Sequence, residues 1–264
     1  MRQCHLHLVL LLSLITATSA ANVTNKEDDV NCLKRVRESL GDPANHLASW
    51  DFSNLTVGSI CSFAGVSCWK PDENRVFALN LPSMSLTGSI PSSLQYCLSL
   101  ASLDLSGNNL SGSIPLALCN WLPYLTYLDL SSNNLNGPIP SEFSNCQYLN
   151  TLKLASNSLS GKIPDSLTQL RRLESVDFSS NRLSGSIPAK FSSFNASDFG
   201  NNPSLCGSPL PHCRGLSRRT RLAIVIASSA FGATATVSLL VVFFVYFFPE
   251  KVFPYLFPNH PNAP

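Results

Sequence analysis

Carboxylate side chains recur at a regular spacing in this chain and are the first candidates for chemistry. Asp104, Asp129 and Asp177 each stand between two large apolar residues. Paired carboxylates can perform general acid–base catalysis, but only in a cleft that gives the two groups different environments. These aspartates recur because the chain around them repeats, so their spacing indicates a periodic surface. We therefore expect no enzymatic activity and no cofactor.

Cysteines are the second candidates, and the chain has nine. Cys61 and Cys68 bracket a short loop before the repeats, and Cys206 and Cys213 bracket another after them. We predict a disulfide in each pair, because a metal site would need further ligands at a suitable spacing. Four other cysteines are expected mostly as buried thiols, with a further bridge left open: Cys32, Cys97, Cys119 and Cys146.

A repeated unit must position these residues. The pattern LxxLxLxxNxLSGxIP starts at Val76, Leu100, Leu125, Leu149 and Leu173, which gives steps of 24, 25, 24 and 24 residues by subtraction. This period and pattern are those of a leucine-rich repeat. The two leucines of LxL point to one face of a short strand. We expect an α/β-type leucine-rich-repeat solenoid with a parallel sheet on its concave face, stable only when the coils stack.

Asparagines at one repeat position are expected to serve the backbone. Asn108, Asn133, Asn157 and Asn181 follow the strands, where a buried amide can bond backbone groups that the turn leaves unpaired. The first copy has Met84 at this position. This departure is consistent with a terminal coil, which has no repeat before it to bond.

The segments that flank the repeats read as caps and targeting sequences. Residues 1–21 combine an apolar run with small residues, which is typical of a cleaved signal peptide. Residues 222–248 carry no charge and are long enough to span a bilayer as a helix. The remaining segments are an N-terminal cap at 22–75, five repeats at 76–195, a C-terminal cap at 196–215, a juxtamembrane stretch at 216–221 and a short cytoplasmic tail at 249–264.

The N-terminal cap has its own pattern. Cys32, Leu33, Val36 and Leu40 have the spacing of an amphipathic helix, and a Gly-Asp-Pro sequence follows them as a stop. Further apolar residues are then available to cover the open end of the first coil: Leu47, Trp50, Phe63 and Val66.

Secretion and a membrane span together predict a single-pass type I protein of the plasma membrane, with the repeats outside the cell. Paired cysteines agree with this orientation, although basic residues are more numerous before the span than after it. Four sequons of the form N-x-Ser/Thr are predicted glycan acceptors. They begin at Asn22, Asn54, Asn109 and Asn195.

The outward positions of the strands form the default contact surface of such a solenoid. This surface has no deep pocket, so it favours a protein partner over a small-molecule ligand. The net charge of +2 and the scattered basic residues give no indication of nucleic-acid binding. We predict Phe77 and Tyr127 as aromatic anchors. The full predicted contact set is Phe77, Asn80, Asp104, Tyr127, Asp129, Lys153 and Asp177.

Several motifs outside the repeat consensus carry a family resemblance. They include Asp29-Val-Asn-Cys-Leu, Val66-Ser-Cys-Trp, Glu73-Asn-Arg-Val, Cys119-Asn-Trp-Leu-Pro and Ala230-Phe-Gly-Ala. The chain resembles plant receptor pseudokinases with five-repeat ectodomains, which bind somatic-embryogenesis-type co-receptor kinases and hold them away from ligand-bound receptors. The resemblance implies a second sheet formed by the LSGxIP segments, and a co-receptor kinase ectodomain as the partner. Family members continue into a kinase or pseudokinase domain, and none of its motifs follows residue 248 here.

The resemblance favours regulation of plant immune, growth or cell-death signalling without kinase activity. Three alternatives remain open at this point. The chain could be a ligand-sensing receptor-like protein that recruits a kinase, an inhibitor of a secreted wall-degrading enzyme, or a truncated product with little function.

Overall fold

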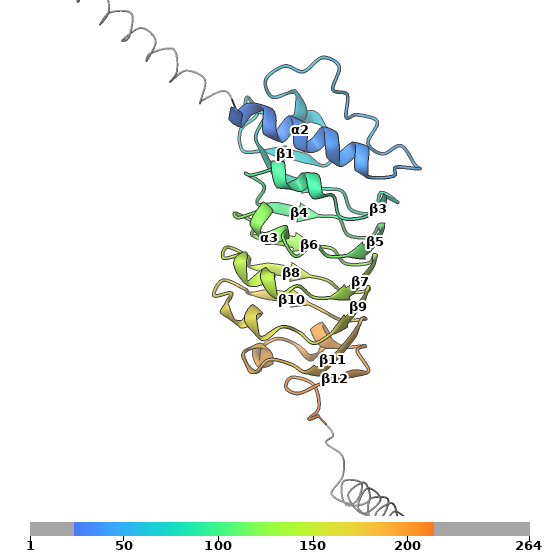
Figure 1. Ribbon diagram of the computed structural model, residues 1–264, viewed down its shortest axis with the longest axis vertical. Helices are drawn as coiled ribbons and strands as arrows, with labels where there is room; N and C mark the ends of the chain where they lie inside the picture. Colours follow the sequence, from blue (N-terminus) through green and yellow to red (C-terminus); the bar gives the residue numbers. More distant parts are fainter. Residues whose placement is uncertain (1–23, 214–264) are drawn as a thin grey trace, which may run out of the picture. The chain divides into compact units, whose positions relative to one another are not determined.

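The structure of the protein, a computed structural model, describes residues 24–213, with side chains from Asp29 onward. These residues form a stack of coils between two caps, and two sheets run along the stack (Figure 1). The predicted leucine-rich-repeat solenoid with disulfide caps is confirmed. The predicted signal peptide, Asn22, the predicted transmembrane helix and the tail lie outside the described residues. No helix within residues 24–213 is long and apolar enough to cross a membrane.

The first sheet carries the strands of the LxL pattern. Its strands are, in spatial order, β1 (Val66–Cys68), β2 (Val76–Asn80), β4 (Ser102–Asp104), β6 (Tyr127–Asp129), β8 (Thr151–Lys153) and β10 (Ser175–Asp177). β1 pairs antiparallel with β2, and the later neighbours are all parallel. The register aligns Asn80, Asp104, Asp129, Lys153 and Asp177 in one row, as the repeat pattern predicts.

The LSGxIP segments form the second sheet that the resemblance implied. Its spatial order is β12 (Ser204–Cys206), β11 (Arg182–Ser186), β9 (Ser158–Gly161), β7 (Asn134–Pro138), β5 (Asn109–Ser113) and β3 (Thr87–Gly88). At one edge, the N–H of Gly41 donates to the carbonyl of Thr87 at 3.0 Å, and the N–H of Thr87 donates back at 2.9 Å. The N-terminal cap therefore closes this edge of the sheet.

Helical elements connect the two sheets or cap the stack. They are α2 (Thr24–Ser39), α3 (Leu118–Trp121) and the 3₁₀ helices η1 (Ser59–Ser62), η2 (Ser92–Tyr96), η3 (Ser141–Asn145), η4 (Asp165–Gln169), η5 (Ala189–Ser193) and η6 (Ala196–Phe199). The predicted cap helix is confirmed as α2, and Cys32, Leu33 and Val36 on it are buried.

The apolar residues predicted to cover the first coil are buried in the N-terminal cap. Trp50 is fully buried, and its indole N–H donates to the carbonyl of Ala64 at 2.9 Å. The Trp50 ring stacks on Phe63 with 6.0 Å between ring centres. Gly65 is required at its position, because its φ is +75° and an added Cβ would lie 2.1 Å from the carbonyl oxygen of Asn80.

The asparagine ladder runs through the stack and is longer than the sequence predicted. The Asn133 amide donates to the carbonyls of Leu105 and Leu130, and its oxygen accepts the N–H of Leu110. Asn202 does the same in the C-terminal cap: its amide donates to the Phe178 carbonyl at 3.0 Å, and its oxygen accepts the N–H of Leu183 at 2.9 Å. The cap is thus an incomplete sixth coil.

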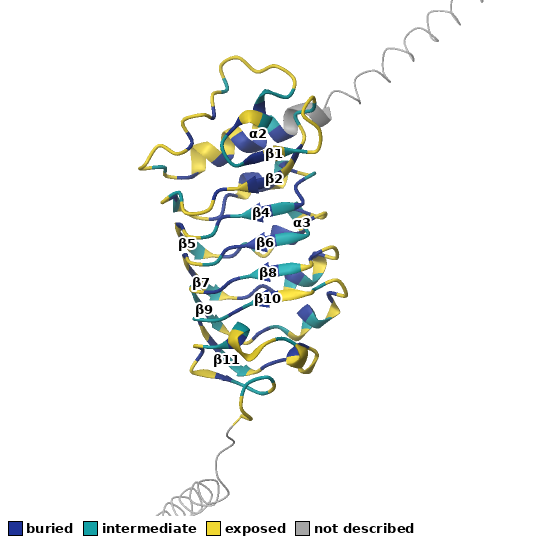
Figure 2. Cartoon of the chain, turned by 180° about the vertical axis from the view of Figure 1, so that it is seen from behind, coloured by how far each residue is buried: buried dark blue, intermediate teal, exposed yellow. Residues whose placement is uncertain are grey.

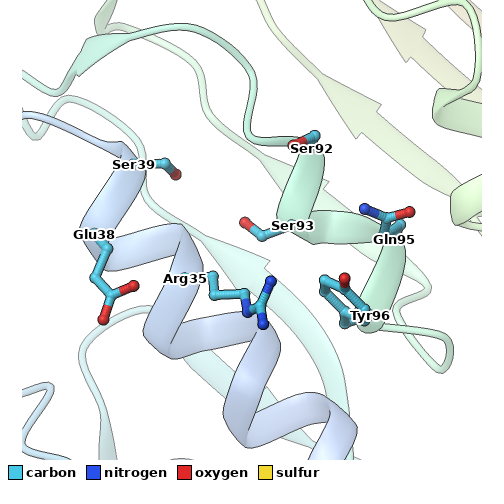
Figure 3. A pocket seen from close by; sticks show the side chains of 7 residues that line it. All are labelled: Arg35, Glu38, Ser39, Ser92, Ser93, Gln95 and Tyr96. Atoms are coloured by element: carbon cyan, nitrogen blue, oxygen red, sulfur yellow. The ribbon is translucent and has the colours of Figure 1, made fainter.

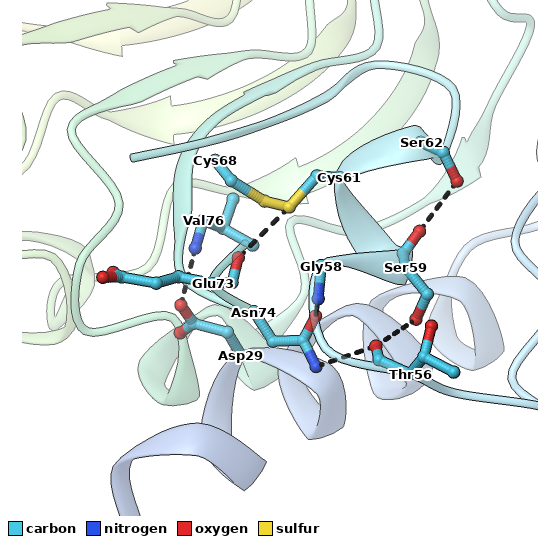
Figure 4. The surroundings of a disulfide bond; sticks show 10 residues. All are labelled: Asp29, Thr56, Gly58, Ser59, Cys61, Ser62, Cys68, Glu73, Asn74 and Val76. Atoms are coloured by element: carbon cyan, nitrogen blue, oxygen red, sulfur yellow. Dashed lines mark hydrogen bonds between the residues drawn. A yellow bond between two sulfur atoms is a disulfide. The ribbon is translucent and has the colours of Figure 1, made fainter. Parts of the chain in front are cut away.

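Four disulfides tie the described chain together, and two of them correct the sequence analysis. The structure joins Cys61 to Cys68, where the N–H of Gly58 also donates to the Asn74 side chain at 2.8 Å (Figure 4), and joins Cys206 to Cys213. The expectation of buried thiols elsewhere is wrong. The other two bridges are Cys32–Cys97 and Cys119–Cys146.

Stacking explains these two additional bridges. Cys119 in α3 and Cys146 after η3 are 27 residues apart, but successive coils bring their Cα atoms to 5.0 Å. Cys32 on α2 meets Cys97 at the end of η2, with a Cα separation of 5.5 Å. All four cysteines are at most 2% exposed. The Cys32–Cys97 bridge joins the cap helix to the first repeat.

Candidate protein-binding surface

A charged cluster occupies the middle of the first sheet. The Tyr127 hydroxyl donates to the Asp129 carboxylate at 3.1 Å, and the Lys153 Nζ lies 3.6 Å from the same oxygen. The Lys153 Nζ also lies 5.6 Å from the centre of the Tyr127 ring, within range of a cation–π interaction. Tyr127 on β6 and Lys153 on β8 are half-buried. Figure 2 shows that both strands carry residues of intermediate burial. The three residues, called the central cluster below, form a preorganised group.

The central cluster favours the protonated forms of the Tyr127 phenol and the Lys153 ammonium group. Burial raises the pKa of Tyr127, and the negative charge of Asp129 raises it further. For Lys153, burial acts in the opposite direction, but Tyr127 and Asp129 outweigh it and the net pKa is raised. At neutral pH this surface therefore presents one ammonium group beside one neutral phenol.

The recurring aspartates have a structural task that the sequence analysis did not identify. Asp104 accepts the N–H of Ser106 at 2.9 Å, and Asp177 accepts that of Ser179 at 3.0 Å, in Asx-type turns at the strand ends. Asp129 makes the same bond to Ser131 and is only 5% exposed. Its carboxylate bonds Ser131 and Tyr127 and lies beside Lys153, so it positions the Tyr127 and Lys153 side chains.

A second group lies at the N-terminal end of the sheet. Phe77 is 37% exposed and packs edge-to-face on Trp69, which is 48% exposed, with 4.8 Å between ring centres. The Arg75 guanidinium lies 5.6 Å from the centre of the Trp69 ring. Trp69 donates to the Ser99 carbonyl at 3.0 Å, and Arg75 donates to the Ser99 hydroxyl at 2.9 Å. These bonds fix Trp69, Arg75 and Phe77, called the cap cluster below, in one arrangement.

The structure adds a stripe of side chains that sequence reasoning missed. Tyr124 and Tyr148 are 55% and 42% exposed, with 6.1 Å between ring centres. The Arg172 guanidinium lies 5.0 Å from the centre of the Tyr148 ring. Tyr124, Tyr148 and Arg172, called the lateral stripe below, sit beside the beginnings of β6, β8 and β10.

The lateral stripe continues the cap cluster along the stack. Each of its members directly precedes the first leucine of a repeat, and Ser99, which anchors Trp69 and Arg75, occupies that position one coil earlier. The signal in the sequence that could have revealed the lateral stripe is the tyrosine before the first leucine of two repeats, Tyr124 and Tyr148. Aromatic and arginine side chains held in place by neighbours are the residue types that dominate binding energy at protein interfaces.

The remaining predicted residues lie outside these groups. Asn80 is exposed at the end of β2. The three sequon asparagines within the described residues, Asn54, Asn109 and Asn195, are also exposed. Residues 24–213 contain no group of three or more side chains suited to a metal ion.

Comparisons with known proteins agree on one family. Residues 26–69 match the leucine rich repeat N-terminal domain, and residues 99–121 and 123–183 match leucine rich repeat families. The chain is 62% identical over 216 residues to the inactive LRR receptor-like serine/threonine-protein kinase BIR2 of Arabidopsis thaliana. That alignment covers 81% of this chain and 36% of BIR2, so the chain spans little more than a third of this relative.

Solved structures match the ectodomain itself. The crystal structure of the BIR2 ectodomain from Arabidopsis thaliana is 52% identical, with a TM-score of 0.70, and the match covers 70% of this chain and 98% of that one. A chain in the crystal structure of the BIR3–SERK2 complex from the same organism is 51% identical, with a TM-score of 0.69. This match covers 71% of the present chain and 100% of that one. The chain therefore belongs to the plant family of leucine-rich-repeat receptor-like inactive kinases that includes BIR2 and BIR3, and the matched region is their ectodomain.

Proposed function

We propose that this protein is a single-pass plasma-membrane receptor-like protein whose extracellular repeats bind the ectodomain of a co-receptor kinase. The observation that carries this proposal is the similarity to a chain in the BIR3–SERK2 complex. That chain is matched over its whole length, at 51% identity. By occupying the co-receptor, the protein would regulate plant immune, growth or cell-death signalling without catalysis of its own.

The binding surface is proposed to combine the cap cluster, the lateral stripe and the central cluster. All three lie on or beside the first sheet, and each contains an aromatic ring next to a cation. Because these side chains already contact one another, binding would cost little additional side-chain entropy. A surface of this kind suits another folded protein with aliphatic side chains and carboxylates at matching positions.

A titration of purified ectodomain, residues 22–215, against immobilised SERK2 ectodomain tests the proposal. The isolated ectodomain is a suitable unit, since the homologous BIR2 ectodomain has been crystallised by itself. Tyr148→Ala and Arg172→Ala should each weaken binding by about 30-fold or more if they are central anchors, and Tyr127→Ala and Lys153→Glu should also weaken it.

Leu116→Ala is the matched control, because Leu116 is 59% exposed but leads into α3 instead of a strand of the first sheet. Its affinity should equal that of the unmodified protein. Absence of binding by a folded, glycosylated ectodomain would reject the function. Binding that none of the four variants weakens would reject the proposed surface.

Residues 222–248 are proposed as the membrane anchor, with the repeats outside the cell. The full chain should stay in the membrane pellet after alkaline carbonate extraction, and external protease should digest the repeats of intact protoplasts. Release into the supernatant would contradict the anchor. Protection of the repeats from protease would contradict the orientation.

Competition tests the regulatory step. Added ectodomain should reduce the amount of co-receptor that a ligand-bound receptor captures, in proportion to the affinity measured in the titration. If the ectodomain bound the co-receptor and left this capture unchanged, occupation of the co-receptor could not be its mode of regulation.

A further inference from the structure

A pocket of about 310 Å³ lies between α2 and η2, apart from the three groups on and beside the first sheet (Figure 3). Arg35 and Glu38 on α2 form one wall, and Ser92, Ser93, Gln95 and Tyr96 on η2 form the other. The Cys32–Cys97 disulfide joins the two walls, because Cys32 is on α2 and Cys97 directly follows η2. The pocket is therefore preformed and covalently braced.

The side chains in this pocket keep most of their hydrogen-bonding capacity. The Arg35 guanidinium lies 5.0 Å from the centre of the Tyr96 ring, which orients its N–H groups. Within the described part of the chain, the side chains of Arg35, Glu38, Gln95 and Tyr96 make no hydrogen bond and no ion pair. Among residues 24–213 the pocket thus offers donors and acceptors without a protein partner, together with one positive and one negative charge.

Ser93 provides an independent indication of a ligand. Its side chain extends from η2 toward α2 (Figure 3), and the residue is only 8% exposed. The Ser93 hydroxyl is buried and has no hydrogen-bond partner among residues 24–213. At the corresponding position in η4, the Ser166 hydroxyl donates to the Ser141 carbonyl at 2.8 Å. A buried hydroxyl without a partner is unfavourable, so a group that enters this pocket and bonds Ser93 would gain affinity.

We propose that this pocket binds one or two units of a neutral oligosaccharide. Each sugar hydroxyl both donates and accepts, which matches the mixed donors and acceptors here. Planar guanidinium, carboxylate and amide groups present paired atoms that suit neighbouring hydroxyls. Because Arg35 and Glu38 balance each other, the site favours neither an anion nor a cation. The pocket volume lies at the lower end of the range for small-ligand sites.

Isothermal titration of the enzymatically deglycosylated ectodomain tests this site. The neutral probes are cellotetraose, laminaritetraose, xylotetraose and mannotetraose, and trigalacturonic acid is the acidic comparison. At least one neutral probe should bind saturably, and Arg35→Ala and Ser93→Ala should each weaken that binding by about tenfold or more, equivalent to about 1.4 kcal/mol. Ser166→Ala is the matched control and should bind like the unmodified ectodomain.

Stability measurements distinguish a ligand contact from a structural role. Ser93→Ala should unfold at the same or a higher denaturant concentration than the unmodified ectodomain, since the hydroxyl has no hydrogen-bond partner among residues 24–213 and its removal takes away an unfavourable buried group. The proposal is overturned if no neutral probe binds, if only trigalacturonic acid binds, or if Arg35→Ala and Ser93→Ala leave the affinity unchanged. Co-receptor binding by Arg35→Ala should remain normal, which separates this site from the proposed protein interface.

Discussion

The side-chain amide of Asn133 donates to the carbonyl oxygen of Leu105, in the preceding coil, at 2.9 Å. Its carbonyl oxygen accepts the N–H of Leu110, also in the preceding coil, at 3.0 Å. One buried asparagine therefore bonds two backbone groups of the coil before its own. Repetition of this arrangement from Asn108 to Asn202 holds the turns of the solenoid together.

Asn133→Ala should lower the free energy of unfolding by about 3 kcal/mol or more, because each buried backbone group left unpaired costs about 1–3 kcal/mol. Urea unfolding followed by circular dichroism measures the change. Asn134→Ala is the control, since Asn134 is exposed and its side chain bonds, among the described residues, only the Asn109 side chain. Equal stability of the two variants would show that the ladder contributes nothing beyond exposed polar contacts.

The disulfides should stabilise the fold in the order of the chain length that each one closes. The Cys32–Cys97 bridge spans 65 residues, Cys119–Cys146 spans 27 and the cap bridges span 7 each. The loop-entropy relation predicts losses of about 4, 3.5 and 2.5 kcal/mol when each pair is replaced by alanine. Denaturant unfolding of the four double variants measures them. A larger loss for a cap pair than for Cys32–Cys97 would contradict this ranking.

Asp129→Ala should destabilise the ectodomain more than Asp104→Ala. Both changes remove the acceptor of a serine N–H two residues further on, but only Asp129 also bonds Tyr127 and lies beside Lys153. The excess measures the central cluster and should be about 1 kcal/mol or more. Urea unfolding of both variants gives the difference. Asp129→Asn should recover part of the lost stability, because the amide oxygen still accepts hydrogen bonds from Tyr127 and Ser131. No recovery would mean that only the charge of Asp129 matters.

The contribution of Tyr127 and Lys153 to stability should stay constant from neutral pH to about pH 9 and should be lost in alkali. The pKa values of Tyr127 and Lys153 are both raised, so their contribution to stability is complete below about pH 10, their ordinary range, and is lost as pH rises through the folded-state values. Between pH 7 and pH 11, the free energy of unfolding should fall more for the unmodified ectodomain than for the Tyr127→Phe, Lys153→Met double variant. Identical decreases would show that these groups do not titrate differently in the fold.

The sequence alone determined the architecture, because the period of the pattern and the strand geometry leave little freedom. Leucines at LxL must share one face, so the repeat starts also set the register that aligns Asp104 with Asp129 and Lys153. The cap helix could be predicted in the same way, since its apolar spacing and its Gly-Asp-Pro stop are local. Membership of the family likewise rested on short motifs that can be read without a structure.

Only the tertiary structure decided which side chains meet across coils. Cys119 and Cys146 are 27 residues apart, and no local rule states that α3 and the end of η3 bring them within bonding distance. The lateral stripe was missed for the same reason: Tyr148 and Arg172 are neighbours only because consecutive coils stack. The contacts of Asp129 likewise come from two strands, since Tyr127 lies on β6 and Lys153 on β8. A repeating sequence determines positions within a coil, whereas contacts between coils depend on how each side chain fills the space beside its neighbours.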